Sequence, residues 1–570
     1  MSLYNDASLV LIPSGYKEGK LYSIKPTDGG GDFTFSRASS ATRRNSSGLI
    51  EKETQNLLLQ SNTFDTTWNN VLSGTITGGQ SGYDGSSDAW LLDKGAVNGR
   101  IQQNIVQSGV QTYSCYAKAG TSNWFSLMIT TSTGDRVAFF DLANGVVGSN
   151  FLLIDKNIES VGGGWYRCSI TFIETTITAR IYVSDGNNDN SGTSGNIYIQ
   201  DAQLNQGLVA DSYLETTTTA VYGGITDDLP RLDYTDASCP SLLLEPQRTN
   251  LITQSEYFDV WGTNSSTLIA NNATSPSGEM NAYKLYPDSS GNYRNLTFGS
   301  QISGLRTFSI FAKAGELEHL VLIDPSGNGA GIDFNLSNGV ATDVSTSGFF
   351  SFDMVDYGNG WYRCIATVTD GYIYYILSDN GGVSVTANGT DGLYLWGAQL
   401  EAASTGMAMP TSYIPTYGTA VTRVSEASAF ELSVFDFFSL SNTESGTFFI
   451  ETKFINQGNP FVDTFSQGGS GTNVWLNTSF IMLNTVSQNS FVVQDITSII
   501  DDYVKILIRK DQTTYNVFIN GVKSATTNTI TNPLKWFDHI ALFRNIQMVK
   551  QFLAFPTALT DSECIALTTL

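Results

Sequence analysis

The sequence has little positive charge, and this limits the partners it can bind. Of its 570 residues, 30 are Lys or Arg and 53 are Asp or Glu, so the formal net charge is −23 at pH 7. Nucleic acid is therefore a poor partner, because phosphate binding needs clustered basic side chains. An anionic membrane surface is equally unsuited. No apolar run approaches the ~18 residues that cross a bilayer, and no secretory signal opens the sequence, so no membrane insertion is expected.

Histidine and cysteine are also scarce, which argues against several kinds of catalytic and metal site. The two histidines, His319 and His539, lie far apart, and no Cys-x-x-Cys pair occurs. Neither a Ser-His-Asp triad nor a zinc site is therefore expected. The five cysteines are odd in number, and Cys115 is answered by Ile310 in the repeat described below. Buried free thiols are expected rather than a disulfide framework.

The composition that remains favours an all-β protein. Gly occurs 54 times, aromatic residues make up 12% of the chain and charged residues only 15%. Such a mixture is typical of short strands joined by many turns. Turn signals recur at a spacing of ~8–12 residues, as in β-sandwiches and jelly rolls. We therefore predict three β-sandwich (jelly-roll) domains in tandem.

The strongest feature of the sequence is an internal repeat. The pentapeptide Gly-Trp-Tyr-Arg-Cys occupies residues 164–168 and again 360–364, and Ala-Lys-Ala-Gly and Ala-Gln-Leu blocks recur around both copies. Repeats of this kind have to be identified before any other prediction of the fold. They predict two copies of one jelly-roll domain, at residues 53–222 and 250–425.

The remaining segments are expected to differ from the repeats. Residues 440–570 predict a third sandwich, with an alternating strand at 447–454 and an Asn-Gly hairpin turn at 520–521. Thr560 and Glu563 have the spacing of a capping box at the start of a short helix. Residues 223–249, which contain three prolines, are predicted to be a connector.

The first 52 residues form an irregular segment that contains a small basic group. Arg37, Arg43 and Arg44 stand close together in an otherwise acidic chain. Two interpretations remain open: a solvated loop, or a segment that docks on an acidic partner through these arginines.

Several of these motifs resemble known families. The Asn-Gly hairpin and the closing Ala-Leu-Thr-Asp-Ser-Glu sequence resemble concanavalin A-like, laminin-G-type lectin sandwiches. The Asn-Leu-Leu opening of the first repeat and the matching Asn-Leu-Ile opening of the second, each followed by Ser, Phe and Trp, resemble carbohydrate-binding modules with a jelly-roll fold. The resemblance implies lectin-like domains throughout the chain.

A further resemblance concerns residues 13–23 and 32–43, which are similar to tail and head-fibre proteins of tailed bacteriophages, particularly those of Bacteroidetes hosts. In such proteins a Gly-Leu-Ile-Glu block is soon followed by Pro-Arg-Leu-Asp-Tyr and Leu-Leu-Glu-Pro-Gln-Arg-Thr-Asn. Here the whole first repeat separates these blocks. The resemblance implies that the first repeat is an insertion and that residues 1–52 pack with residues 225–250 as a virion-attachment element.

Together these resemblances imply a virion structural protein, assembled in the host cytoplasm, that serves as a tail or head fibre or as a capsid decoration. Its expected partners are other virion proteins (capsid, portal or tail), cell-surface or environmental glycans, and further copies of itself in a homo-oligomer. No enzymatic activity and no cofactor are expected, although the acidic loop at residues 185–189 could offer oxygen ligands to Ca²⁺. Two alternatives are an enzyme that degrades capsule or other polysaccharide, and a purely structural virion protein without a ligand.

Candidate sugar contacts come from the aromatic residues. The tryptophan of each pentapeptide could stack on a sugar, but a small sandwich also needs a buried tryptophan, and both copies would keep it for folding. Arg167 and Arg363 are expected to pair with a carboxylate. Aromatic residues that differ between the copies are better candidates, and we select Trp124 and its counterpart His319.

Overall fold

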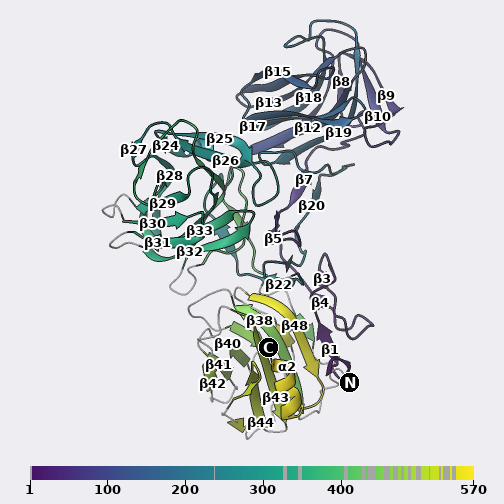
Figure 1. Cartoon of the computed structure of the whole chain (residues 1–570). Coiled ribbons are helices and arrows are strands. Elements are labelled where there is room, and N and C mark those ends of the chain that lie inside the picture. Colours follow the sequence, from purple (N-terminus) through teal and green to yellow (C-terminus); the bar gives the residue numbers. More distant parts are fainter. Residues whose placement is uncertain are drawn as a thin grey trace.

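A computed structural model gives the fold of the protein (Figure 1). It describes residues 3–236, 238–324, 330–344, 349–403, 409–426, 431–433, 445–454, 462–465, 473–476, 480–484, 490–495, 502–511, 514–524, 528–529, 539–541 and 547–569. Strands dominate, and the α-helix of the described chain is α2 (Asp561–Thr568), close to the C-terminus. The predicted all-β class, with β-sandwich units in tandem, is confirmed.

The first repeat, which we call unit 1, contains two six-stranded antiparallel sheets packed face to face. One sheet has the order β16 (Asp155–Gly162), β17 (Trp165–Ile173), β12 (Val110–Ala119), β19 (Asn196–Gln206), β10 (Ala89–Lys94) and β9 (Ser73–Gln80). The other has the order β15 (Val146–Phe151), β14 (Gly134–Asp141), β13 (Trp124–Thr131), β18 (Thr176–Ser184), β11 (Arg100–Gln107) and β8 (Asn69–Val71). Side chains between the sheets form one apolar core.

The second repeat, unit 2, forms a single ten-stranded sheet that bends over its own core. The order is β25 (Ser266–Ala273), β26 (Ala282–Pro287), β35 (Leu393–Ala402), β28 (Asn295–Lys313), β33 (Trp361–Ser378), β29 (His319–Asp324), β30 (Ala330–Asn335) and β31 (Val340–Asp343). Two further strands complete it: β24 (Gly262–Asn264) pairs with β28, and β32 (Phe349–Gly358) with β33.

The two units differ because the long strands of unit 2 are interrupted in unit 1. β28 corresponds to β11 plus β12, which are separated at Ser108 and Gly109, and β33 corresponds to β17 plus β18, which are separated at Glu174 and Thr175. Gly109 has a φ of 100° and Glu174 a φ of 152°. The counterpart of Gly109, Gly304, also has a positive φ of 71°, but β28 continues through it with a shift in its pairing with β33. The interruptions therefore divide one bent sheet into two.

Four of the five cysteines lie in these cores or in the C-terminal part. All five are free thiols; Cys115, Cys168, Cys364 and Cys564 are buried. Cys115 and Cys168 face each other across β12 and β17 within the core of unit 1. The prediction of buried free thiols is confirmed for these four and wrong for Cys239, which is exposed in the connector.

The C-terminal part contains a sheet that three separate segments of the chain build together. Its order is β21 (Leu232–Asp233), β22 (Ser241–Leu244), β48 (Gln547–Phe555), β38 (Ser445–Phe454), β43 (Val504–Asp511), β44 (Thr514–Ile519) and β45 (Val522–Lys523), with β46 (Asn528–Thr529) on β44. β1 (Leu9–Leu11) also pairs with β48, beside β22. A four-stranded sheet made of β39 (Val462–Phe465), β40 (Asn473–Leu476), β41 (Phe480–Asn484) and β42 (Ser490–Asp495) lies in the same part. We call the described residues within 3–52, 224–247 and 424–569 the base.

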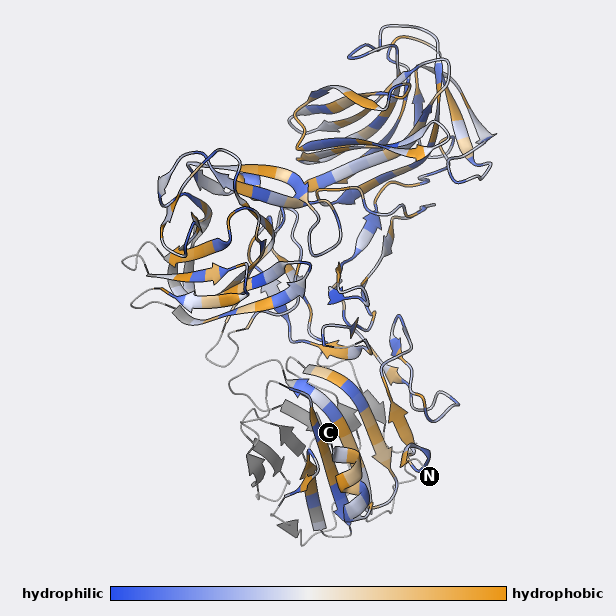
Figure 2. Cartoon of the chain, viewed as in Figure 1, coloured by the Kyte–Doolittle hydropathy of each residue, from blue (hydrophilic) through white to orange (hydrophobic). Residues whose placement is uncertain are grey.

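Residues 9–11 thus belong to a folded sheet. Figure 2 shows β1 as hydrophobic along its length, next to β48. Ala7 and Val10 pack with Phe449, Leu553 and other residues on one face of the sheet. The alternation at 447–454 predicts one buried face, but Phe448, Phe449 and Ile450 are all buried, because the N-terminal residues and α2 cover the second face.

The irregular remainder of the leader lies against the connector. The structure contains short ladders of β2 (Tyr16–Lys17), β3 (Lys20–Leu21) and β4 (Phe33–Thr34), and of β5 (Arg43–Arg44) with β6 (Ile50–Glu51). The amide of Ala41 donates to the carbonyl of Ile225 at 3.0 Å, and that of Tyr234 to the carbonyl of Arg44 at 3.1 Å. Residues 1–52 and 225–250 are therefore in direct contact through the backbone.

Each unit leaves and rejoins the base through a pair of adjacent strands. β7 (Thr54–Asn56) pairs with β20 (Val221–Gly223), and β23 (Arg248–Asn250) pairs with β36 (Val421–Arg423). One asparagine closes each unit. Asn56 donates to the carbonyls of Ala202 and Leu214 in unit 1. Its counterpart Asn250 donates to the carbonyls of Ala398 and Ile414 in unit 2. In Figure 1 both termini lie in the base, and the two units extend from it.

The predicted local signals near the C-terminus are also present. Asn520 and Gly521 connect β44 to β45 with φ values of 46° and 79°, as a type I′ turn requires. Thr560 caps α2, and a reciprocal contact with Glu563 completes the capping box. Both predictions are confirmed, because each depends on a few neighbouring residues alone.

Candidate functional site

Arg37, predicted to dock on a partner, is buried inside the protein. Its side chain is fully shielded, and Nη1 contacts Glu426 Oε1 at 2.8 Å. The other guanidinium nitrogens donate to the carbonyls of Ser39 and Thr226. With every donor directed inward, Arg37 cannot face a partner, and the docking prediction is wrong for this residue.

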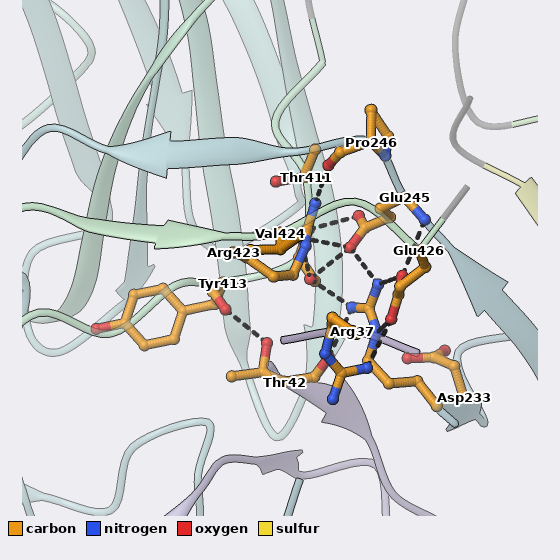
Figure 3. A network of polar contacts seen from close by, with 12 residues as sticks. Arg37, Thr42, Asp233, Glu245, Pro246, Thr411, Tyr413, Arg423, Val424 and Glu426 are labelled. Atoms are coloured by element: carbon orange, nitrogen blue, oxygen red, sulfur yellow. Dashed lines mark hydrogen bonds and ion pairs between the residues drawn. The ribbon is translucent and has the colours of Figure 1, made fainter. Parts of the chain in front are cut away.

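Arg37 belongs to a buried network of three arginines and two glutamates at the centre of the base (Figure 3). Arg231 lies between Glu426 and Glu245, with Nη2 at 2.8 Å from Glu245 Oε2. Arg423 Nη1 lies 2.6 Å from the same Glu245 oxygen. The five side chains come from the leader, from the connector and from residues 423–426, where unit 2 returns to the base, so the network ties these segments together.

Glu245 stays ionised in this buried position. Burial alone would raise its pKa, but Arg423 and Arg231 lower the pKa to about 2. Ser412 adds two hydrogen bonds, from its amide at 2.7 Å and its hydroxyl at 2.6 Å. A depressed pKa contributes stability that is complete above the ordinary value and is lost as the pH falls towards 2. The network therefore holds throughout the neutral range.

Arg43 and Arg44, the other two predicted docking residues, make contacts within the chain. Arg43 Nε contacts Glu51 at 2.9 Å, and Nη1 donates to the Tyr16 hydroxyl at 2.9 Å. The Arg44 guanidinium lies 4.8 Å from the ring centre of Tyr357 in unit 2. Both line a cavity of about 150 Å³ where the leader, unit 2 and the C-terminal part meet. Arg44 thus connects the base with unit 2, Arg43 makes its contacts within the leader, and the docking role of both stays a prediction.

Trp124 and His319 occupy equivalent positions in separate units, at the starts of β13 and β29. The Trp124 ring is half-buried beside Gly148, where an added Cβ would lie 2.6 Å from it. His319 Nδ1 lies 2.9 Å from Asp333 Oδ1. The structure does not bring the two residues together, and their role in sugar contact stays a prediction.

The tryptophans of the repeated pentapeptide are buried, as a role in folding requires. Trp165 and Trp361 are each 2% exposed. The expected carboxylate partners of the neighbouring arginines are wrong. Arg167 donates to the backbone carbonyl of Asp211, and Arg363 to the Ser309 hydroxyl and the Thr411 carbonyl. Sequence cannot reveal these partners because backbone oxygens carry no residue-specific signal.

Each unit carries an aromatic cluster on the face of the sheet that points away from its core. Side chains alternate along a strand, so β12 directs Cys115 and Ala117 into the core and Tyr116 to the opposite face. Tyr116 and Trp165 form this cluster in unit 1. Phe311 and Trp361 are their counterparts in unit 2.

In unit 2 this aromatic face is covered by the base. Ile50 from the leader packs in the same cluster as Phe311, Trp361 and Trp396. The amide of Ile50 also donates to the carbonyl of Pro276 at 2.8 Å. The face is therefore an internal contact and is closed to a ligand.

In unit 1 the same face carries a covering residue of its own, Tyr83, from the loop between β9 and β10. The Tyr83 ring stacks on Tyr116 with centroids 3.9 Å apart and an interplanar angle of 3°, and it meets Trp165 edge-on at 6.4 Å. Within the described chain, every member of this cluster belongs to unit 1. Tyr83 keeps part of its surface accessible.

Polar groups surround Tyr83. Gln200 holds the loop: its Oε1 accepts from the Tyr83 amide at 3.1 Å, and its Nε2 donates to Asp88 at 2.8 Å and to Ser86 at 3.2 Å. Asp84 and Asp88 are exposed. The Tyr83 hydroxyl donates to Asp201 at 3.0 Å, and burial raises the pKa of Asp201 to about 6. An aromatic ring bordered by the exposed carboxylates of Asp84 and Asp88 can stack on a sugar and bond its hydroxyls.

Sequence reasoning overlooked Tyr83, although a signal for it was present. Residues 81–88 align with residues 274–281, where no aromatic residue occurs. Trp124 was selected because it is an aromatic residue that differs between the copies. Tyr83 meets the same criterion. The loop's lack of strand pattern concealed it.

The acidic loop proposed for Ca²⁺ is engaged by other groups. Asp185 pairs with Lys94 and accepts from the amide of Gly192 at 2.8 Å, while Asp189 accepts from the amide of Ser191. Among the described residues, no group of three or more His, Cys, Asp or Glu is placed to hold a metal ion.

A second buried charge cluster lies where the two units meet. Lys52 Nζ contacts Glu279 at 2.9 Å, and Glu256 and Asp211 lie close enough to act on the same lysine. Burial raises the pKa of Asp211 to about 7 despite the opposing effect of Lys52. It raises the pKa of Glu256 in the same way. Three carboxyl groups thus share one ammonium group at this junction.

This cluster predicts that the protein becomes less stable as the pH rises from about 4 to about 7. The folded state retains the Asp211 proton up to about pH 7, whereas the unfolded state loses it near pH 4. The slope from one such group is at most about 1.4 kcal/mol per pH unit. Asp211→Asn should reduce the slope, as measured by denaturant unfolding at pH 4, 5.5 and 7. An unchanged slope would contradict the assignment.

The fold and these sites define an all-β protein with tandem β-sandwich units on a composite base. No protein-family model and no curated protein matches the chain. Among solved structures, it is similar to the tandem CBM22-1–CBM22-2 domain at the N-terminus of Xyn10C from Paenibacillus barcinonensis. That match has 11% identity and a TM-score of 0.21, and covers 61% of this chain and 97% of that chain.

The chain is also similar to the LG1–3 region of the laminin α2 chain, with 11% identity and a TM-score of 0.14 over 81% of this chain and 97% of that chain. Similarity at this level carries no argument about function, so the description of the fold rests on the strands of the chain itself. No helix in the described part of the chain is long and apolar enough to cross a membrane.

Proposed function

We propose that the protein is a glycan-binding display protein whose unit 1 carries the ligand site on its outward aromatic face. One observation supports this most strongly. Two equivalent aromatic faces exist, and the base covers only that of unit 2. On unit 1 the loop with Tyr83, Asp84 and Asp88 takes the place of the base. Packing alone does not require a loop that places an accessible tyrosine beside exposed carboxylates on this face.

The wider setting that we propose is a bacteriophage particle, in which the base is the attachment element of a tail fibre, head fibre or decoration protein. Support comes from the resemblance of the leader and connector to such fibres, and from the way both segments join one sheet with β48. Partners would be other virion proteins, with several copies adding avidity to weak single sites. We propose no catalytic role.

Substituting Tyr83 tests this function. Tyr83→Ala removes the stacking surface, and we expect glycan affinity to fall about tenfold, since an aromatic contact contributes about 0.5–1.5 kcal/mol beyond the buried area and about 1.4 kcal/mol is a factor of ten. Calorimetric titration of the full chain would use sugars first selected on a glycan array. Tyr222→Ala, at a tyrosine that is 50% exposed elsewhere on unit 1, is the matched control.

Separate measurements distinguish the two alternative functions. A blank array at millimolar sugar would favour a purely structural protein. Release of reducing ends from a polysaccharide, abolished by a single carboxylate substitution, would establish an enzyme. Equal affinity of the wild type and Tyr83→Ala would place the binding site elsewhere.

A further inference from the structure

A polar groove lies between the two units, away from the Tyr83 loop. It has a volume of about 550 Å³ and is lined by Gln107, Ser108, Gly109, Ile173, Glu174, Thr175, Gln206, Gln254, Tyr417, Gly418, Thr419 and Val421. The volume is within the usual range of ligand sites, ~300–1,000 Å³. Both units contribute residues to the lining, so a molecule held there would contact both.

The groove lies where the strands of unit 1 are interrupted. The gap between β11 and β12 contains Ser108 and Gly109, and the gap between β17 and β18 contains Glu174 and Thr175. Glu174 has a φ of 152°, in a region that residues with a side chain rarely adopt and that is often found at functional sites. Unit 2 keeps both strands continuous through the corresponding regions.

One side chain in the groove lacks a partner. Gln254 is 8% exposed, and no described residue donates a hydrogen bond to its buried Oε1. A buried amide oxygen without a donor costs about 1–3 kcal/mol. Because Oε1 is shielded, the Gln254 side chain would have to turn toward the groove for a ligand hydroxyl to relieve that cost.

We propose that this groove is a second glycan subsite, which binds a neutral oligosaccharide segment and bridges the two units. This inference rests on the proposed glycan-binding function. The lining is made chiefly of amides and hydroxyls, with Glu174 as its charged residue. Glutamine amides both donate and accept, as vicinal sugar hydroxyls require. The Ser108 and Thr175 hydroxyls share a hydrogen bond of 2.8 Å, which leaves one hydroxyl proton and further lone pairs for a ligand.

An extended peptide fits this groove less well than a sugar. Peptides that join a sheet edge need unpaired backbone groups. Here the amide of Val110 already donates to the carbonyl of Tyr417 at 2.9 Å, and that of Gly418 donates to the carbonyl of Thr253 at 2.7 Å. Hydrogen bonds to a ligand would therefore have to come from the side chains of the lining.

The test uses calorimetric titration of the full chain with neutral oligosaccharides of two to four residues. We expect two sites per chain, of which Tyr83→Ala removes one. Gln254→Leu, which should fold because it removes an unpaired amide, is expected to weaken the other site at least tenfold. Thr419→Trp, at an exposed position that can fill the groove, should do the same. Gln247→Leu, at an exposed glutamine of the base, should leave the affinity of both sites unchanged.

Each result decides between the two proposals. One site that is lost in Tyr83→Ala and unaffected by Gln254→Leu would overturn the groove and leave the proposed function intact. Binding that survives Tyr83→Ala but is lost in Gln254→Leu would support the groove and reject the Tyr83 site. Binding of an extended peptide with no oligosaccharide binding, or no binding of either, would overturn the groove.

Discussion

Replacing Glu426 with glutamine is expected to lower the free energy of unfolding by about 3–5 kcal/mol, the usual cost of removing one partner from a buried ion pair. Glu426 is fully buried and contacts both Arg37 and Arg231. Without its charge the network would hold three arginines against Glu245 alone. The loss arises because Arg37 would stay buried without a carboxylate partner, while Arg231 and Arg423 would share Glu245. Denaturant unfolding of the full chain measures it.

Two companion variants make this result specific. Asp561 also contacts two cations, Arg509 and Lys523, but its side chain is 50% exposed, so Asp561→Asn should cost about 1 kcal/mol or less. The double variant Glu426→Gln with Arg37→Met should recover part of the loss, because the unpaired cation is removed as well. Equal effects of Glu426→Gln and Asp561→Asn would contradict the buried network.

The second large effect is expected at Val10. Val10→Asp places a carboxylate among Phe449, Leu553 and Phe555, where Val10 is 3% exposed. The substitution should destabilise the base by about 3 kcal/mol or more, since a buried unpaired charge is among the most costly changes. Val106→Asp, at a valine that is 78% exposed, should change stability by about 0.5 kcal/mol or less.

Hydrogen exchange can localise the effect of Val10→Asp. Loss of β1 uncovers the edge of β48, so backbone amides near Phe552 and Ala554 should exchange faster, while those in the core of unit 1 should keep their protection. Unchanged exchange along β48 would mean that the leader does not pair with the C-terminal sheet.

The parts of the fold that could be predicted depend on repetition or on local chemistry. The duplicated pentapeptide predicted two related sandwiches, and Asn520-Gly521 predicted a hairpin turn that the structure contains. Each of these signals lies within a few residues. The interruptions at Gly109 and Glu174, by contrast, give the copies different sheet topologies, and single residues of this kind do not reveal whether a strand continues.

The contacts between distant segments could not be predicted from composition. Arg37 is close to Glu426 only after two whole units have folded between them, so its basic character suggested an external partner. The leader looked irregular because its strands are two or three residues long and complete a sheet that lies more than 400 residues away in the sequence.

The candidate site shows how far aromatic patterns can lead. Trp165 and Trp361 were expected to stabilise the fold, and both are buried. The comparison between copies selected Trp124 and His319 but overlooked Tyr83, which lies in a loop without strand periodicity. The two equivalent faces differ in how they are covered. Ile50 of the base packs on the face of unit 2 and not on that of unit 1. Such a difference depends on the arrangement of the units and is absent from either repeat alone.

The most direct test of this account is a crystal structure of the full chain soaked with the sugar that binds most tightly on the array. We predict electron density for a pyranose ring against Tyr83, with its hydroxyls within hydrogen-bonding distance of Asp88 or Asp84. Density for the sugar elsewhere, with Tyr83 unoccupied, would contradict the assignment of the outward face of unit 1 as the glycan site.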